Sequence, residues 1–251
     1  MEIKKPISAK DRIILALDVD TIEDVVRYVD LLKDYVGFFK VGMPLFTSCG
    51  FEAVDTIKNH GGKVYFDGKF QDIPDTVAKT SINLMKKGID FFSISATGGS
   101  KMMINTLNAC LNYAKKQEIA PPVILAVTLL SSFGQKTLTN ELCIDMNISR
   151  YVLKLAQIAN EAGLSGVVAP DVDAARIKTE LGEDFIIVCP AVRPTWAIVN
   201  DQIRIVSPSD AIKAGADYMI IGRPITLAHD PVAAAKLIIA EIEEALKEKE
   251  E

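Results

Sequence analysis

Short runs of apolar residues recur along the chain, and each run is followed by a segment with helical periodicity. The runs are apolar throughout instead of alternating with polar residues, which is typical of parallel strands covered on both faces. We therefore predict strands at residues 13–18, 36–41, 63–67, 90–95, 122–128, 165–169, 185–189 and 217–221. The helical segments are 22–34, 73–88, 99–117, 147–162, 172–181 and 230–248, with a short helix in 207–215.

Eight strand–helix units follow one another without a break in composition. This pattern predicts an α/β protein with a closed (β/α)8 TIM barrel as a single domain over residues 1–251. We expect an N-terminal extension of about residues 1–11 and a charged tail at 248–251. A doubly wound open sheet is the alternative, but the GxGxxG motif that usually follows its first strand is missing.

Two predicted connections are longer than the usual few residues: 129–146 after the fifth strand and 190–206 after the seventh. Active sites of barrels are built from the loops that follow the strands. We therefore expect both connections to act as lids or binding loops.

Composition excludes several function classes. The net charge of −5 argues against a general binder of nucleic acid or of anionic membranes. No uninterrupted apolar run approaches the ~18–20 residues of a membrane span, and the N-terminal segment lacks the apolar core of a signal peptide. The four cysteines form no CxxC pair, so we expect them to be reduced and buried in a cytoplasmic protein.

Histidine is scarce, and this limits the chemistry available. The chain has two histidines, His60 and His229, and we expect both at the surface. Their scarcity argues against most zinc sites and against acid–base catalysis by histidine. Any catalytic chemistry would then depend on Lys, Asp and Ser.

Charged residues gather where predicted strands end. Asp18 ends the first strand, Lys40 lies near the end of the second and Asp67 ends the third. Asp67 and Lys69 should point the same way on an extended backbone, because side chains alternate with a period of two. Asp72 follows just before the next helix. Each residue alone is explained as well by helix capping or a solvated surface, but together they indicate a site at one barrel mouth.

A cluster of alternating charges favours one kind of chemistry. Charges held close together in a partly dry site interact strongly, and alternating signs keep every member ionised. A lysine between carboxylates can act as a general acid, while a carboxylate beside an anionic substrate group raises the energy of the bound substrate. This combination suits loss of CO₂ with protonation of the resulting carbanion.

The stretch DGKFQDIPDT at residues 67–76 closely resembles the D-x-K-x-x-D-I-P-x-T motif of the orotidine 5′-phosphate decarboxylase family. The family's K-V-G motif is matched by residues 40–42, and its LALD first strand by residues 15–18. The resemblance runs from about Arg12 to Ala235 in the same motif order. It implies conversion of orotidine 5′-monophosphate into UMP and CO₂ in de novo pyrimidine synthesis, with no cofactor and no metal.

The resemblance also implies a role for each residue of the charged cluster. Lys69 would donate a proton to C6 of the pyrimidine as CO₂ leaves, and Asp67 would face the departing carboxylate. Lys40 would order the network and reach the ribose, whose hydroxyls Asp18 would also bind.

Two further residues are implied to act across a homodimer interface. In the family the second aspartate and the threonine of the motif reach the partner's active site, which here are Asp72 and Thr76. We therefore expect a homodimer with shared active sites and inactive monomers. Neither nucleic acid nor membrane is expected as a partner.

Gly222 and Arg223 directly follow the last predicted strand, where barrels often bind phosphate. Glycine allows close backbone approach, and arginine offers a planar fork that matches phosphate oxygens. A turn with a surface charge would explain the pair equally well. The resemblance adds Gln202 as a second phosphate ligand, Arg204 as a weaker one, and Arg193 in PAVRP as a further substrate-binding residue.

The fifth and seventh loops carry two other candidates. Ser132 in VTLLSSF aligns with the family's serine that contacts the pyrimidine, although a plain turn serine is an equal alternative. Trp196 fits a hydrophobic contact of a closing lid.

The chain also departs from the family pattern. Ser95 stands where relatives commonly have the histidine of H-A-x-G-G, so local hydrogen bonding should differ. Ala191 replaces a glycine, and alanine resists a positive φ. Asp75 replaces a usual Asn or Glu and adds a negative charge near the mouth.

Two other functions compete with this one. Related sugar-phosphate enzymes, such as 3-keto-gulonate-phosphate decarboxylase or hexulose-phosphate synthase, share the fold and the D-x-K-x-x-D motif but use Mg²⁺. They typically have a glutamate where this chain has Lys40, and a lysine there would repel the metal. A non-enzymatic nucleotide-binding barrel would keep the phosphate residues but lose members of the charged set, all of which are present.

Overall fold

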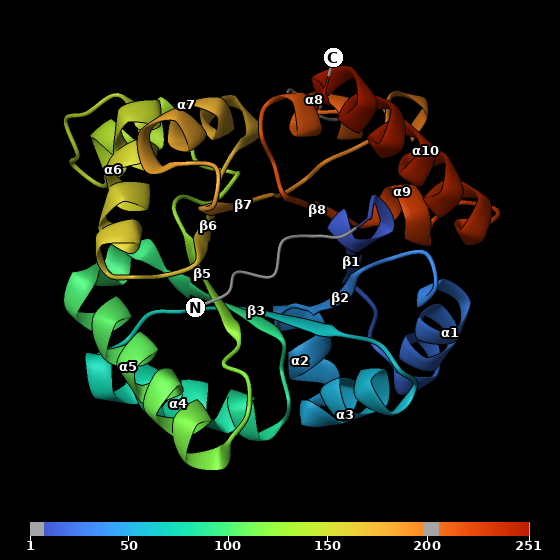
Figure 1. The fold of residues 1–251 in the computed structure, drawn as a ribbon, viewed down its shortest axis with the longest axis horizontal. Coiled ribbons are helices and arrows are strands. Elements are labelled where there is room, and N and C mark those ends of the chain that lie inside the picture. The colour runs from blue at the N-terminus through green and yellow to red at the C-terminus, as the bar shows by residue number, and fades with distance from the viewer. Residues whose placement is uncertain (1–7, 198–205, 251) are drawn as a thin grey trace.

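Eight parallel strands form a closed barrel in sequence order, with helices around the outside (Figure 1). The computed structural model describes residues 8–197 and 206–250. The strands are β1 (Ile13–Leu17), β2 (Phe38–Val41), β3 (Val64–Phe70), β4 (Phe91–Ser95), β5 (Val123–Val127), β6 (Gly166–Val168), β7 (Ile186–Cys189) and β8 (Tyr218–Ile221). The predicted single-domain (β/α)8 barrel and its eight strands are confirmed.

Most helices lie where the periodicity predicts them. These helices are α1 (Ile22–Leu32), α4 (Pro74–Lys86), α5 (Gly99–Gln117), α6 (Ile148–Glu161), α7 (Asp171–Leu181), α8 (Pro208–Lys213) and α10 (Pro231–Glu250). Polar caps fix several of their starts: the side chain of Asn147 accepts hydrogen bonds from two backbone N–H groups of α6, and Ser207 forms a capping box with Asp210 at α8.

Three helices are not among those expected from the sequence. They are α2 (Met43–Cys49), α3 (Phe51–Asn59) and the short α9 (Arg223–Thr226). Gly50, with φ of 59°, separates α2 from α3 and turns the chain between them. Both helices are short, and a glycine between two apolar segments is a weak sequence signal for two helices instead of a loop.

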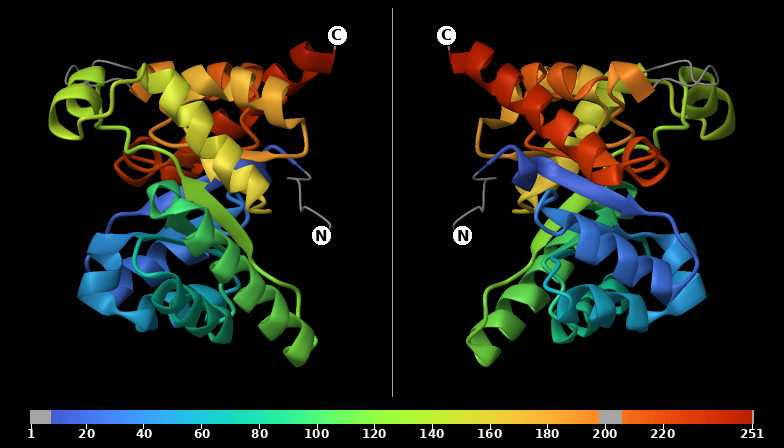
Figure 2. Two further views of the ribbon diagram at one scale, coloured as in Figure 1. Left: turned by 90° about the vertical axis from the view of Figure 1, so that its left-hand side faces the viewer. Right: turned by 90° about the vertical axis from the view of Figure 1, so that its right-hand side faces the viewer.

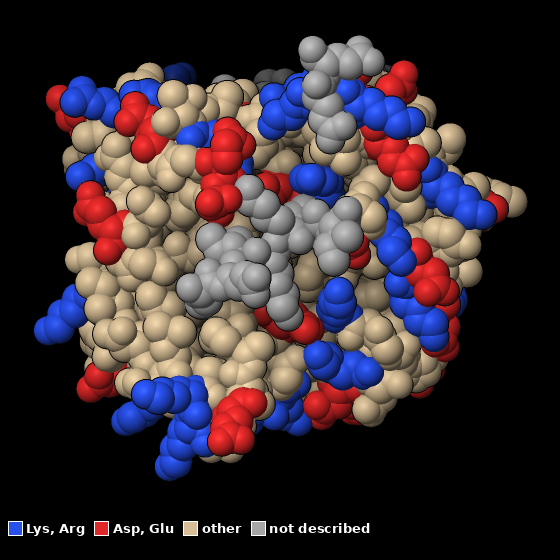
Figure 3. Space-filling view, in the orientation of Figure 1, with Lys and Arg blue, Asp and Glu red and all other residues tan. Residues whose placement is uncertain are grey.

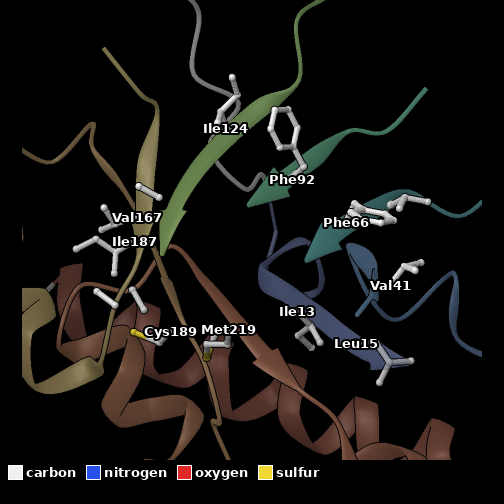
Figure 4. Packing of buried hydrophobic residues seen from close by; sticks show 14 of the residues in the cluster. Ile13, Leu15, Val41, Phe66, Phe92, Ile124, Val167, Ile187, Cys189 and Met219 are labelled. Carbon is white, nitrogen blue, oxygen red and sulfur yellow. The ribbon is translucent and has the colours of Figure 1, made fainter. Parts of the chain in front are cut away.

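The buried residues form two layers that follow the alternation of side chains along each strand. Ile13, Leu15 and Leu17 point outward and belong to the large cluster between barrel and helices. Figure 4 shows such outward residues on several strands, among them Val41, Phe66 and Phe92. The inward residues of the barrel form a second cluster: Ile14, Ala16, Phe38, Tyr65, Phe91, Val123, Leu125, Val127, Val168, Ile186, Val188, Tyr218 and Ile220.

The two ends of the barrel have different structures. At the end where strands begin, buried Lys178 donates hydrogen bonds to the carbonyl oxygens of Glu183 and Phe185 (2.8 and 2.9 Å) and to Asp217 Oδ2 (2.8 Å). The backbone N–H of Ile187 donates to the same carboxylate oxygen. At the other end the yellow-green β5–α6 connection projects from the barrel, away from the blue segment that leads into β1 (Figure 2).

The burial of the cysteines differs in part from expectation. Cys110 and Cys189 are buried, whereas Cys143 is exposed, so the prediction that all four are buried is wrong. Burial raises the pKa of Cys110 to about 12.

No helix within residues 8–197 and 206–250 is long and apolar enough to cross a membrane. Acidic and basic side chains are interspersed on the face seen in Figure 3.

Candidate active site

The alternation of side chains along the strands carries three charged residues from the barrel interior to its mouth. Ala16, Phe38 and Tyr65 point inward, so the residues two positions later point the same way at the strand ends. The pairs are Ala16 with Asp18, Phe38 with Lys40, and Tyr65 with Asp67. Backbone pairing sets Lys40 beside Tyr65 in the β2–β3 register.

The charged side chains form one continuous chain of contacts. Lys69 Nζ lies 2.6 Å from Asp67 Oδ2, and Lys40 Nζ lies 4.0 Å from the same oxygen. Lys40 Nζ is also 3.4 Å from Asp18 Oδ1. The order Asp18–Lys40–Asp67–Lys69 alternates in sign. The Asp67 and Lys40 side chains are only 9% and 11% exposed, whereas Lys69 is 39% exposed and can reach a bound molecule.

The other carboxylate oxygen of Asp67 is held by two residues that sequence reasoning missed. Ser93 Oγ donates a hydrogen bond to Asp67 Oδ1 at 2.8 Å, and the hydroxyl of Tyr65 donates to it at 3.3 Å. Burial, and then the nearby charge of Asp67, raise the pKa of Tyr65 well above its usual value, so its hydroxyl stays protonated. The available signal was a serine in phase with inward-pointing Phe91 in an otherwise apolar strand.

Glycines allow close packing at this mouth. A Cβ added to Gly42 would lie 2.8 Å from Lys40 Nζ, so the glycine of the K-V-G motif leaves room for the ammonium group. A Cβ on Gly222 would lie 3.2 Å from Ala16 Cβ and 3.9 Å from Asp18 Oδ2. Gly222 therefore lies beside Asp18, at one end of the series of charged contacts.

The strand that carries the motif is longer than predicted. β3 continues to Phe70, and its register against β4 shifts between Phe66 and Phe70. Lys69 in this irregular segment has a φ of 46°, a left-handed conformation that is uncommon for a residue other than glycine. Asp67 and Lys69 nevertheless meet, as the sequence predicted.

Asp72 and Thr76 lie outside the chain of contacts. Both are exposed, and Asp72 Oδ1 accepts a hydrogen bond from the backbone N–H of Ile73 at 2.6 Å. Ile73 itself is 68% exposed, which is high for a large apolar side chain. Within one chain, these residues face solvent instead of completing the charged cluster.

The remaining candidates that the structure describes follow strands at the same end of the barrel. Ser132 is an exposed turn residue after β5, and Arg223 is the exposed first residue of α9. Arg193 is half-buried, and its backbone N–H donates to the carbonyl oxygen of Val206 at 2.8 Å. Gln202 lies outside the described residues, as does Arg204. Trp196 is 48% exposed in a 3₁₀ turn.

The departures from the family pattern have local consequences. Ser95 Oγ and Thr97 Oγ1 are 2.7 Å apart, and Thr97 Oγ1 donates to Gln71 Oε1 at 2.9 Å. These hydroxyls tie the loop after β4 to the motif loop after β3. Asp75 accepts a hydrogen bond from Asn105 of α5 at 2.9 Å. The new charge at residue 75 is thus paired with a neutral amide.

Ala191 adopts the conformation that its glycine counterpart would favour. Its φ is 59°, although alanine disfavours the left-handed region. The chain continues through Val192, which pairs with Val206 in an isolated bridge. Local strain is therefore stored at the entrance to the β7–α8 connection.

No group of three or more His, Cys, Asp or Glu residues suited to a metal ion occurs in the part of the chain that the structure describes. At the mouth, the place between Asp18 and Asp67 is taken by the ammonium group of Lys40. Chemically, the site offers a proton donor, partly exposed Lys69, beside a fixed carboxylate.

Comparison with known proteins identifies the family. The family described as "Orotidine 5'-phosphate decarboxylase / HUMPS family" matches residues 11–238. Orotidine 5′-phosphate decarboxylases of Syntrophotalea carbinolica and Pelobacter propionicus are 43% and 45% identical to this chain, covering 96% and 93% of it and 99% and 96% of their own lengths. A solved structure of the Lactobacillus acidophilus enzyme has a TM-score of 0.81 at 32% identity, covering 95% of this chain and 99% of its own. The chain belongs to the orotidine 5′-phosphate decarboxylase / HUMPS family.

Proposed function

We propose that this protein decarboxylates orotidine 5′-monophosphate to UMP and CO₂ without a cofactor, as a step of de novo pyrimidine synthesis. The observation that carries the proposal is the alternating contact chain Asp18–Lys40–Asp67–Lys69 at the barrel mouth. Relatives that carry this enzyme's name, at 43–45% identity over nearly the whole chain, support it.

The reaction breaks the bond between C6 and the carboxylate carbon, and the bonding electron pair stays on C6. Lys69 donates its proton to C6, forming the new C–H bond, and the resulting neutral amine recovers a proton from solvent. Asp67, which is nearly buried, faces the substrate carboxylate and disfavours that charge in the bound ground state. The 2.6 Å contact between Lys69 and Asp67 supports this pairing of roles.

The rest of the substrate is bound away from the reacting carbon. Lys40 and Asp18 bind the ribose hydroxyls, and Ser132 contacts the pyrimidine. Binding energy from these remote groups holds the carboxylate against Asp67.

The phosphate group is bound by the loops after β7 and β8. Gly222 allows the backbone to approach the phosphate, and Arg223 pairs with its oxygens. Arg193 and Gln202 complete this end of the substrate. The place of Gly222 beside Asp18 supports a ligand that spans the mouth from the ribose to the phosphate.

A homodimer completes the site in this proposal. Asp72 and Thr76 are contributed to the partner's active site, and their exposure in a single chain beside apolar Ile73 supports an interface there. We place the protein in the cytoplasm, and its unpaired cysteines support a reducing compartment.

A Mg²⁺-dependent sugar-phosphate reaction is the competing activity within the same family. Lys40 disfavours it, because its ammonium group lies within 4.0 Å of both nearby carboxylates. A divalent cation bound there would be repelled at close range.

The proposal is tested by the loss of orotidine monophosphate absorbance, measured with a metal chelator present. We expect full turnover by the wild-type protein, and about 10²–10⁴-fold or greater loss in Lys69→Ala, because this change removes the general acid. UMP binding by the variant should remain measurable by calorimetry.

Lys33→Ala is the matched control, since Lys33 pairs at the surface with Asp30 of α1 and donates to the carbonyl oxygen of His60, and neither residue belongs to the proposed site. It should leave turnover unchanged. Turnover that disappears in the chelator would favour the metal-dependent reaction, and substantial activity of Lys69→Ala would contradict its role as proton donor.

A further inference from the structure

Ser93 connects the two residues on which the proposed reaction depends. It lies in the middle of β4, points into the barrel and is completely buried. Its Oγ donates to Asp67 Oδ1 at 2.8 Å and accepts from the backbone N–H of Lys69 at 3.0 Å. One hydroxyl therefore holds both a carboxylate and the backbone that carries the neighbouring ammonium group.

The backbone of Lys69 requires such support. A φ of 46° costs a lysine about 1–2 kcal/mol relative to the right-handed region. The regular ladder between β3 and β4 is interrupted between Phe66 and Phe70, so the strand pairing does not fix this residue. The hydrogen bond to Ser93 Oγ replaces a ladder bond at this point.

The two oxygens of Asp67 have separate partners. Oδ1 accepts from Ser93 and, at the longer distance of 3.3 Å, from Tyr65. Oδ2 faces Lys69 and Lys40. The hydroxyls therefore fix the rotation of the carboxylate and leave the other oxygen turned to the two ammonium groups.

We propose that Ser93 is a positioning residue for decarboxylation, which sets the geometry between Asp67 and the Lys69 ammonium group; this inference rests on the proposed function. Ser93 does not donate the proton and need not touch the substrate. A hydroxyl is required because it donates and accepts at once, which neither an alanine nor a purely donating group can do. Tyr65 supports the same carboxylate oxygen at a longer distance, and the backbone N–H of Lys69 donates its hydrogen bond to Ser93.

The test compares Ser93→Ala with the wild type by steady-state kinetics and by UMP binding. We expect kcat to fall about 10–100-fold, because small displacements of reacting groups are costly. The Kd for UMP should change less than about threefold, since the ribose and phosphate contacts remain. Ser93→Thr, which keeps the hydroxyl, should recover most of kcat.

Hydrogen exchange gives a second readout that does not depend on turnover. In Ser93→Ala the amide of Lys69 loses its acceptor, so a peptide that covers residues 67–72 should exchange faster than in the wild type. Ser81→Ala is the control: Ser81 is equally buried, but its Oγ donates only to the carbonyl oxygen of Val77 within α4. It should change neither kcat nor exchange in this peptide.

The outcomes separate the two proposals. A wild-type protein that does not decarboxylate the substrate would overturn the proposed function, and the inference with it. An active wild type with an equally active Ser93→Ala would overturn the inference alone, as would equal losses in kcat and UMP affinity. If Ser93→Ala does not fold, Ser93→Cys replaces it: a thiol of similar size but poor hydrogen bonding should still lower kcat.

Discussion

At the scale of single residues, the position of the Lys40 ammonium group depends on the absence of a side chain at Gly42. Gly42 has an ordinary φ of −96°, so its role is not conformational freedom. Its missing side chain leaves the space where Lys40 Nζ lies between two carboxylates. Small size, and not flexibility, explains the glycine of the K-V-G motif.

Gly42→Ala should therefore lower activity more than stability. The added methyl would lie 2.8 Å from Lys40 Nζ and displace the flexible end of that side chain. We expect kcat/KM to fall about 10-fold or more, while the melting temperature stays near that of the wild type. Thermal unfolding and steady-state kinetics measure the two effects. An unchanged kcat/KM in a folded variant would show that the position of Lys40 is not critical.

Arg223 provides a separate test at the phosphate end. If it pairs with the phosphate, Arg223→Ala should weaken UMP binding by about 1.5–3 kcal/mol, or roughly 10–150-fold, and leave uridine binding nearly unchanged. Isothermal titration with both ligands measures the difference. Arg176→Ala, at an exposed position of α7, is the control and should affect neither ligand. Equal losses for the two ligands would remove Arg223 from the phosphate site.

At the scale of elements, the β7–α8 connection contains strain that a single substitution can release. Ala191→Gly should stabilise the protein by about 0.5–1 kcal/mol, since glycine adopts the φ of 59° without a steric penalty. Chemical denaturation measures the free energy of unfolding. Ala175→Gly, on the exposed side of α7, should instead destabilise by a similar amount. Destabilisation by Ala191→Gly would mean that the strain does not persist in solution.

The strands and longer helices could be predicted because their apolar patterns are set by burial. The runs around β1 and β5 are apolar on both faces, which is typical of parallel strands covered on both sides. α2 and α3 could not be predicted in this way, because each is short and Gly50 separates them. Their existence depends on packing against the barrel, which is a tertiary effect.

The candidate site, too, could be predicted from the sequence only in part. Strand-end positions and the period of two predict that Asp18, Lys40 and Asp67 meet, because the fold fixes where strand ends lie. The bend that gives Lys69 a positive φ depends on a hydroxyl from the adjacent strand. The hydrogen bond between Ser93 and Lys69 depends on the register of β3 against β4. A local sequence pattern does not contain that register.

At the scale of the whole molecule, the proposed site needs two copies of the chain. Subunits that carry Asp18→Ala and Asp72→Ala should each be nearly inactive alone. After mixing and subunit exchange, a hybrid dimer would have one intact site, and random pairing would restore about a quarter of wild-type activity. The absorbance assay measures this recovery. No recovery, in a mixture shown by native mass spectrometry to contain hybrids, would contradict site sharing.

The Lys178–Asp217 pair lies at the end of the barrel where strands begin, and the contacts among Asp18, Lys40, Asp67 and Lys69 lie at the end where strands finish. The Lys178 ammonium group donates to two backbone carbonyls as well as to Asp217, so it helps to hold the starts of β7 and β8 together. Tolerance to mutation should therefore be uneven along the barrel axis. Laboratory evolution toward a new substrate would have most freedom in the loops that follow the strands, provided that the Lys178–Asp217 pair is left intact.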